Sequence, residues 1–209
     1  MAVSANGKFL AVTSRNCTVN AGAIKGYGQI SLINLHTGAS RAWPFRWPAR
    51  PADLSLSADG SLLEFVSNPS NGTRVVDARL DHVWVLRTNS RPGPVEDHYR
   101  SVAGPALVTA ALSRNGSLTW ILAVKRVSNA RSTLTITGMK TETGHQVVKF
   151  TKSVRHQVGI ADLIPDASGR HILIVGWSAA LHWFDVAHRH IVTIPNGNMS
   201  TFRPVSTAW

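Results

Sequence analysis

The feature of this sequence that most constrains its fold is a phrase that recurs four times: an apolar run, a tight polar turn ending in glycine, and a second apolar run. The turn glycines are Gly7, Gly60, Gly116 and Gly169, so successive copies lie 53, 56 and 53 residues apart. A nearly constant period of this order marks an array of similar supersecondary units. The sequence predicts units of approximately 1–48, 49–104, 105–157 and 158–200, with 201–209 as the start of a further strand.

Each unit contains four segments with strand character. Two of them flank the glycine turn, where Asn or Asp beside Gly supplies the positive φ of a tight hairpin. The third alternates apolar and polar residues, as in Thr133-Leu-Thr-Ile-Thr137, which is typical of a half-buried strand. Four antiparallel strands in up-and-down order form a propeller blade. We therefore expect an all-β fold, a β-propeller of about four four-stranded blades in one domain over 1–209; a β-sandwich would not repeat this phrase at constant spacing.

The turns carry a resemblance to a known family. Ser-x-Asp/Asn-Gly stands at 57–60 and 113–116, and Thr-Gly at 37–38 and 143–144. Over nearly its whole length the chain resembles the WD-repeat-like and YncE-like bacterial β-propeller proteins. In contrast to the WD signature, no Gly-His pair opens a unit and no Trp-Asp dipeptide ends the third strand of a unit; His182-Trp-Phe-Asp185 is the nearest match. The resemblance implies a scaffold or receptor for other proteins, in a family whose bacterial members often follow a membrane anchor.

The two ends of the array permit two arrangements. The segment Phe202–Trp209 could complete the first blade and close a ring, or it could open a fifth blade of a longer propeller. We expect the second arrangement, an incomplete or open arc. Because the edges of an open arc carry unpaired strands, this expectation includes self-association or a missing partner half.

Composition restricts the partners. The chain has 22 Lys and Arg against 11 Asp and Glu, a net charge of +11, which favours acidic partners. The cations are scattered singly, without the basic run of a nucleic-acid patch, so nucleic acid is disfavoured. Cys17 is the single cysteine, which excludes an internal disulfide. The sequence shows no secretory signal and no apolar stretch of about 18 residues, so we expect a soluble chain and assign no compartment.

The best candidate contact surface is the Trp-Pro-rich segment between the first two units. Trp43 and Trp47 are flanked by Arg46 and Arg50, and Trp and Arg are the residue types that anchor protein interfaces. We expect this segment to be exposed and to bind the partner. An alternative is that both indoles cover a groove between blades.

A second set of candidates would face a propeller channel. Asp53 and Asp162 each stand seven residues before a turn glycine, at the place where propeller enzymes put calcium or catalytic groups, or where a repeat residue binds loop amides. His188 and His190 stand two residues apart, as paired metal ligands sometimes do. We interpret them as solvent-facing imidazoles, because the spacing brings together fewer ligands than a metal site needs. Nucleophile-elbow and phosphate-loop motifs are absent.

Taken together, these features lead us to expect a non-enzymatic module without cofactor or metal that binds a protein or peptide on a propeller rim. The alternative is an enzyme, or a metal- or sugar-binding propeller, that uses residues of the channel.

Overall fold

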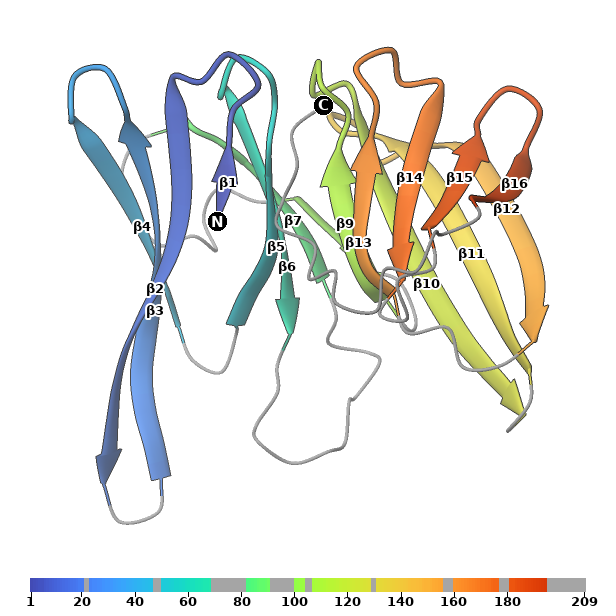
Figure 1. Ribbon diagram of the computed structural model, residues 1–209. Coiled ribbons are helices and arrows are strands. Elements are labelled where there is room, and N and C mark those ends of the chain that lie inside the picture. The colour runs from blue at the N-terminus through green and yellow to red at the C-terminus, as the bar shows by residue number, and fades with distance from the viewer. Residues whose placement is uncertain are drawn as a thin grey trace. The chain divides into compact units, whose positions relative to one another are not determined.

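The computed structural model describes residues 1–20, 23–46, 50–68, 82–90, 100–103, 107–128, 131–155, 160–176 and 181–194, in which every regular element is a β-strand (Figure 1). The strands form four sheets of four strands, and in every sheet neighbouring strands are also neighbours in the chain and run antiparallel. The expected all-β, antiparallel architecture is confirmed. Among these described residues there is no helix with the length and apolarity needed to cross a bilayer. The predicted strand at 201–209 lies outside the described residues.

Each predicted unit holds one sheet. The first sheet contains β1 (Ala2–Val3), β2 (Phe9–Asn20), β3 (Ala23–Asn34) and β4 (Ser40–Arg46). The second contains β5 (Arg50–Leu56), β6 (Leu62–Asn68), β7 (His82–Arg87) and β8 (Arg100–Ala103). The third contains β9 (Leu107–Leu112), β10 (Leu118–Ser128), β11 (Arg131–Lys140) and β12 (Gln146–Arg155). The fourth contains β13 (Ile160–Pro165), β14 (His171–Gly176), β15 (Leu181–Asp185) and β16 (His190–Ile194).

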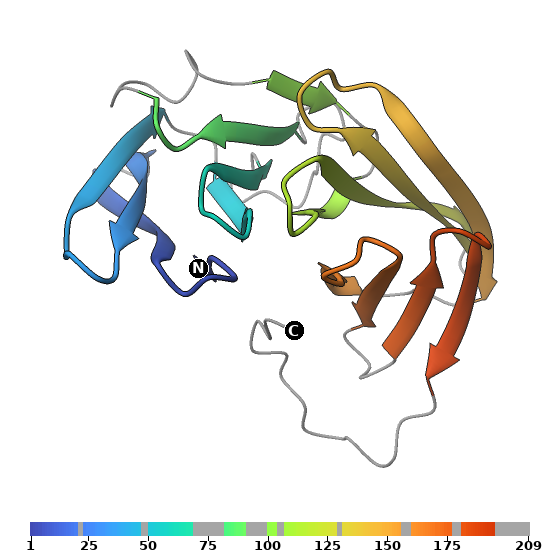
Figure 2. The same cartoon turned by 90° about the horizontal axis from the view of Figure 1, so that it is seen from above.

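The chain divides into two compact units, Met1–Pro105 and Ala106–Trp209, each with two sheets. In the first unit β1, β2 and β3 contact β5, and in the second unit β9 and β10 contact β13. Seen from above, the first strands of the two sheets of each unit lie side by side (Figure 2). Inside each unit, therefore, two sheets face each other with their first strands adjacent.

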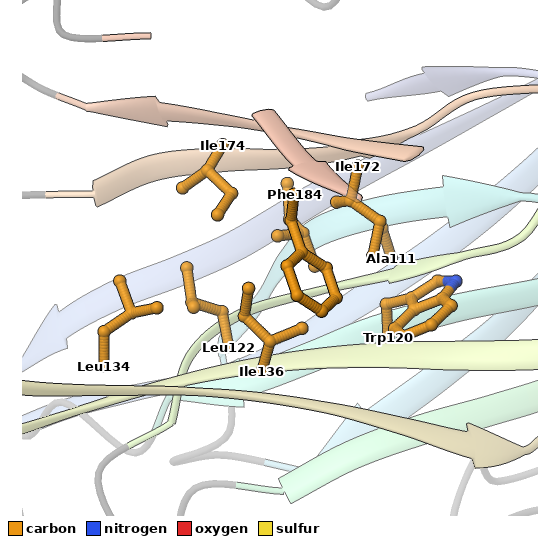
Figure 3. Packing of buried hydrophobic residues seen from close by; sticks show 9 residues of the cluster. Ala111, Trp120, Leu122, Leu134, Ile136, Ile172, Ile174 and Phe184 are labelled. Carbon is orange, nitrogen blue, oxygen red and sulfur yellow. The ribbon is translucent and has the colours of Figure 1, made fainter. Parts of the chain in front are cut away.

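A buried apolar cluster fills the seam between the two sheets of each unit. In the first unit the seam residues are Ala11, Ile30, Leu32 and Trp43 from the first sheet and Leu56, Leu63, Phe65 and Leu86 from the second. In the second unit they are Ala111, Trp120, Leu122, Leu134 and Ile136 from the third sheet and Leu163, Ile172, Ile174 and Phe184 from the fourth (Figure 3). Residues of one strand that enter a seam are spaced two apart, as the alternation of strand side chains requires.

The recurring glycine turn is held by its own side chains. Ser113 Oγ donates to Asn115 Oδ1 at 2.9 Å and accepts the N–H of Leu118 at 2.9 Å. Ser4 with Asn6 and Ser57 with Asp59 make the same two contacts. The glycine that follows has φ between 68° and 73° in the four turns, a conformation that costs L-residues strain. The spacing of serine, Asx and glycine thus encodes one loop.

The fourth turn reaches the same loop with donor and acceptor exchanged. Asp166 stands where the other turns have serine, and Ser168 stands where they have Asn or Asp. Ser168 Oγ donates to Asp166 Oδ2 at 2.8 Å, and the N–H of Arg170 donates to Asp166 Oδ1 at 3.1 Å. The copy that matches most loosely in sequence therefore keeps the loop, because the serine hydroxyl donates to the Asx oxygen whichever of the two positions each residue occupies.

Candidate functional site

The expected contact residue Trp43 is not on the surface. Its side chain is 0% exposed and lies in the seam of the first unit, opposite Ile30 in the register of β3 and β4. The prediction of an exposed Trp43 was wrong, and its place in the seam agrees with the alternative of an indole that covers a groove between sheets. Trp47 lies outside the described residues. Arg46 ends β4 and Arg50 begins β5, and their side chains are outside the described part of the chain.

The two candidate channel carboxylates occupy equivalent irregularities of first strands. The register of β5 shifts between Ala52 and Ser55, around Asp53, and that of β13 shifts between Ile160 and Asp162. Asp53 is exposed with φ +50°. Asp162 is half-buried and its Oδ1 accepts the N–H of Leu163 at 2.8 Å; burial nevertheless raises its pKa. A bond to a backbone amide is the contact expected of a structural repeat residue.

Neither carboxylate completes a metal centre among the described residues. The structure brings no group of three or more His, Cys, Asp or Glu side chains together in the part of the chain that it describes. Asp53 belongs to the first compact unit and Asp162 to the second. The geometry within each unit therefore supplies one carboxylate at this position, fewer than the three or four ligands that hold a metal.

The positive charge of the chain is concentrated in the third sheet, which reasoning on the sequence missed. Residues 107–155 contain eight cations and a single acidic residue, Glu142, so they carry +7 of the net +11. The cations are Arg114, Lys125, Arg126, Arg131, Lys140, Lys149, Lys152 and Arg155. They do not form a run, but a count of charge per predicted unit would have found them. Antiparallel pairing gathers charges that are dispersed along the chain.

Five exposed cations of β10, β11 and β12 define what we call the cationic edge: Lys125, Arg131, Lys140, Lys149 and Lys152. Lys125 pairs with Thr133 and Lys149 with Thr137 in the register of the sheet, so both lysines project from the face opposite the seam. Among the described residues none of the five has an ion-pair partner; the two ion pairs described there join histidines to aspartates. The cationic edge is thus uncompensated charge in the described structure.

The field of the cationic edge reaches the neighbouring sheet. The pKa of His182 on β15 is lowered, first by burial and then by the positive charge of Lys152. At the outer side of this surface, β12 pairs with β11 and has no second strand neighbour in the described part of the sheet (Figure 1). From Gln146 to Ser153, β12 is largely exposed. An edge strand of ten residues with free backbone groups therefore lies within the cationic surface.

The face of the fourth sheet opposite the seam forms a second surface, which we call the end face. It comprises Leu173, Leu181, Trp183, Val192 and Ile194, which share one side through the pairs Leu173–Trp183–Val192 and Leu181–Ile194. Trp183 is 38% and Val192 48% exposed. A hollow of about 480 Å³ lies over β15 and β16, lined by Trp183, Asp185, His188, His190, Val192 and Ile194. Large apolar side chains exposed together are a mark of an interaction surface.

The polar rim of this hollow is an ion pair. Asp185 Oδ1 accepts the backbone N–H of His188 at 3.0 Å, and its Oδ2 lies 2.8 Å from Nδ1 of the same residue. These two contacts, the backbone one first, lower the pKa of Asp185 to about 2. The carboxylate in turn raises the pKa of His188. His188 therefore forms an ion pair with Asp185 within the hairpin that joins β15 and β16.

Comparison with known proteins bears on the fold. No protein-family model and no curated protein sequence matches the chain. Similar solved structures include the tricorn protease (TM-score 0.56, 12% identity, covering 97% of this chain and 22% of that one) and U3-55K (0.55, 11%, 91% and 49%). The acylaminoacyl peptidase of Pyrococcus horikoshii is a third (0.58, 10%, 90% and 31%).

These similar proteins carry β-propeller domains, and the chain spans between about a fifth and a half of their lengths. At 10–12% identity the likeness concerns the fold alone. Two of the three are peptidases, so the comparison does not support the expectation of a non-enzyme. At this low sequence identity it does not contradict that expectation either, because a shared fold does not imply a shared activity. The chain is an all-β protein of antiparallel sheets similar to β-propeller domains.

Proposed function

We propose that the chain is a WD-repeat-like β-propeller module without catalytic activity, whose sheets act as blades and which binds an acidic protein segment at the cationic edge. The observation that carries the proposal is the net charge of +7 in residues 107–155, together with the five exposed cations of the cationic edge, which have no ion-pair partner among the described residues. Uncompensated cations exposed on one sheet attract acidic partners and select against basic ones. The surface replaces the Trp43 segment as the place of binding.

The strand at this surface suggests the binding mode. An extended segment can pair with the free backbone groups of an edge strand, which supplies affinity, while side chains of the edge supply specificity. Lys149 and Lys152 project from opposite faces of β12 because they are three residues apart on one strand. A segment with acidic residues on both of its faces would satisfy both lysines. The proposal is therefore β-strand addition of an acidic segment along β12.

Lysines on an edge strand also have a simpler role, since they discourage uncontrolled strand pairing. The two roles differ in what happens when the lysines are neutralised. A purely protective role predicts aggregation of the neutralised variant and no acidic ligand for the wild type. A binding role predicts a soluble variant with weaker binding.

The test is binding of a fluorescein-labelled oligoglutamate peptide, followed by anisotropy at low and at physiological salt. In the triple variant Lys125→Gln, Lys149→Gln, Lys152→Gln we expect about a tenfold loss of affinity, because three exposed ion pairs at about 0.5 kcal/mol each amount to roughly one decade. Wild-type binding should weaken as salt is raised, since exposed charges are screened.

The matched control removes three exposed cations elsewhere: Lys8→Gln, Arg170→Gln, Arg189→Gln. It changes the net charge equally and should alter the affinity less than twofold. Equal losses in both triple variants would show attraction by net charge alone and would contradict the proposal. So would tight binding of a labelled DNA duplex together with no binding of the peptide, because that result would assign the surface to nucleic acid.

A further inference from the structure

We propose that the end face of the fourth sheet is the docking site for the first sheet of a second copy of this chain, so that copies associate head to tail. The inference goes beyond the acidic-segment proposal and uses a different surface. It rests on an interface that the chain builds twice within itself, once in each compact unit, and on the corresponding apolar faces that its first and last sheets expose.

Leu173, Leu181 and Trp183 of the end face occupy positions that are buried in the two internal seams. By turn spacing and strand register, Leu181 corresponds to Ile30 of the first sheet and to Ile136 of the third, both 0% exposed. Trp183 corresponds to Leu32, which is 5% exposed in its seam, whereas Trp183 is 38% exposed. Where a following sheet is present in a unit, it covers the positions of Leu173, Leu181 and Trp183. The counterparts of Val192 lie at the border of the seam: Val148 is half-buried, and Arg41 is exposed but donates to the Thr88 carbonyl of the second sheet at 3.1 Å.

The first sheet presents the other half. Leu10, Val12 and Ile33 lie on its side away from the seam, with Val3 next to them on β1. They correspond in register to Leu63, Phe65 and Leu86 of the second sheet and to Ile172, Ile174 and Phe184 of the fourth. Those six counterparts are 0–2% exposed in the seams. We call Val3, Leu10, Val12 and Ile33 the lead face; Val3 is 51% exposed and the other three are half-buried.

The lead face and the end face correspond to faces that already pack on each other within the chain, and the two sheets carry opposite net charges. The residues that correspond to the lead face already pack, in both units, on residues that correspond to the end face. The first sheet, residues 1–46, carries five cations and no acidic residue, whereas residues 160–194 carry three aspartates and two arginines. The charges of +5 and −1 attract. Such a contact joins two different patches, one on each copy, so it is heterologous.

The experiment measures mass in solution by sedimentation equilibrium and light scattering over a hundredfold range of concentration. The wild type should show twice the 22.6 kDa of one chain at the higher concentrations. Two variants each disable one face at an exposed position: Val192→Asp on the end face and Val3→Asp on the lead face. Because every heterologous contact then contains one altered half, each variant alone should dissociate at least tenfold more readily.

Mixing the two variants distinguishes the head-to-tail contact from any symmetric one. The end face of Val3→Asp and the lead face of Val192→Asp are intact, so the mixture should recover a dimer that neither variant forms alone. Val127→Asp, at a valine 63% exposed on β10, serves as the matched control and should leave the mass unchanged.

Three results would overturn the inference. A wild type that stays monomeric throughout the range would show that another partner or none covers the faces. A dimer that Val192→Asp abolishes and Val3→Asp leaves intact would indicate an end-face to end-face contact. Failure of the mixture to recover the dimer would exclude the heterologous pairing. Oligoglutamate binding by Val192→Asp should equal that of the wild type, so the failure of either proposal can be recognised separately.

Discussion

A single methyl group added at Gly138 tests how closely the second seam is packed. Gly138 pairs with Trp120 across β10 and β11, and the indole lies over the glycine. A Cβ built at Gly138 would stand 2.6 Å from Cζ3 and 2.9 Å from Cη2 of Trp120, closer than real contacts allow. Trp120 is 0% exposed and surrounded by the seam, so its ring has little room to withdraw (Figure 3).

The magnitude follows from two opposing effects. Overpacking of a filled core costs about 1–3 kcal/mol in the free energy of unfolding. Replacing glycine by alanine also restricts the unfolded chain, which is worth about 0.4–1 kcal/mol where the backbone tolerates it, and Gly138 has no positive φ. Gly138→Ala in the wild type should therefore destabilise the protein by roughly 1–2 kcal/mol.

The sign should invert once the indole is removed. Trp120→Leu eliminates the atoms that the new methyl group would strike, at a cost below the about 3–5 kcal/mol of a Trp→Ala change. In that background Gly138→Ala should be neutral or stabilising by up to about 1 kcal/mol. The coupling between the two changes, obtained from the double-mutant cycle, should then amount to about 1–3 kcal/mol.

The assay is equilibrium unfolding in urea, followed by far-ultraviolet circular dichroism because the tryptophan content differs between variants. Equal slopes against urea would license comparison of the four free energies. If Gly138→Ala destabilises both backgrounds to the same extent, the packing of Trp120 on Gly138 is not the cause. The account of the seam would then be refuted.

Two further predictions concern the last hairpin. Arg189→Gly should stabilise the protein by up to about 1 kcal/mol, measured as an increase in Tm, because Arg189 holds φ +51° where two other hairpins have glycine. The control Arg170→Gly, at a residue without positive φ, should lower Tm. A lower Tm in Arg189→Gly would contradict the conclusion that the backbone of Arg189 is strained. Because the pKa of Asp185 is lowered, its contribution to the stability of the folded state is present above the ordinary pKa of 3.8 and is lost as pH falls toward about 2. Because the pKa of His188 is raised, its contribution to stability is present below the ordinary pKa of 6.5 and is lost as pH rises through the pKa of the folded state. Asp185→Asn should return the His188 pKa to its ordinary range in an NMR titration, whereas Asp166→Asn should not; an unchanged value in Asp185→Asn would exclude the ion pair as the cause.

The sequence predicted the strand order of this chain well because turns are encoded locally. Serine, Asx and glycine within four residues determine the loop through contacts such as those of Ser113 with Asn115 and Leu118. These contacts need nothing from distant parts of the chain. Even the fourth turn, with Asp166 and Ser168 exchanged, was recognisable by its glycine. Four sheets of four strands follow once the turns and the alternating segments are assigned.

The location of Trp43 could not be predicted in the same way. The Trp-Pro-rich segment resembles an exposed loop, yet Trp43 and Pro44 belong to the edge strand β4, where proline is tolerated. Which side of the sheet Trp43 takes depends on its pairing with Ile30, and a shift of one residue would have placed it outside. The sequence contained the strand but not its register. The cationic edge escaped prediction for a related reason, since its charges meet only after β10, β11 and β12 are paired.

One cross-strand pair on the trailing face of a sheet shows why the turns repeat more clearly than the core. At one equivalent position the first sheet pairs Ala11 with Leu32, the third pairs Trp120 with Gly138, and the fourth pairs Leu173 with Trp183. In the two seams that are closed, a large residue stands beside a small one, so total volume is preserved while identity is not. In the fourth sheet both members are large. A pair of this size leaves apolar surface that a facing sheet would cover, and Trp183 is exposed in its absence. Among these three pairs the summed volume is greatest for Leu173 with Trp183, so the end face has the most apolar surface for a facing sheet to cover.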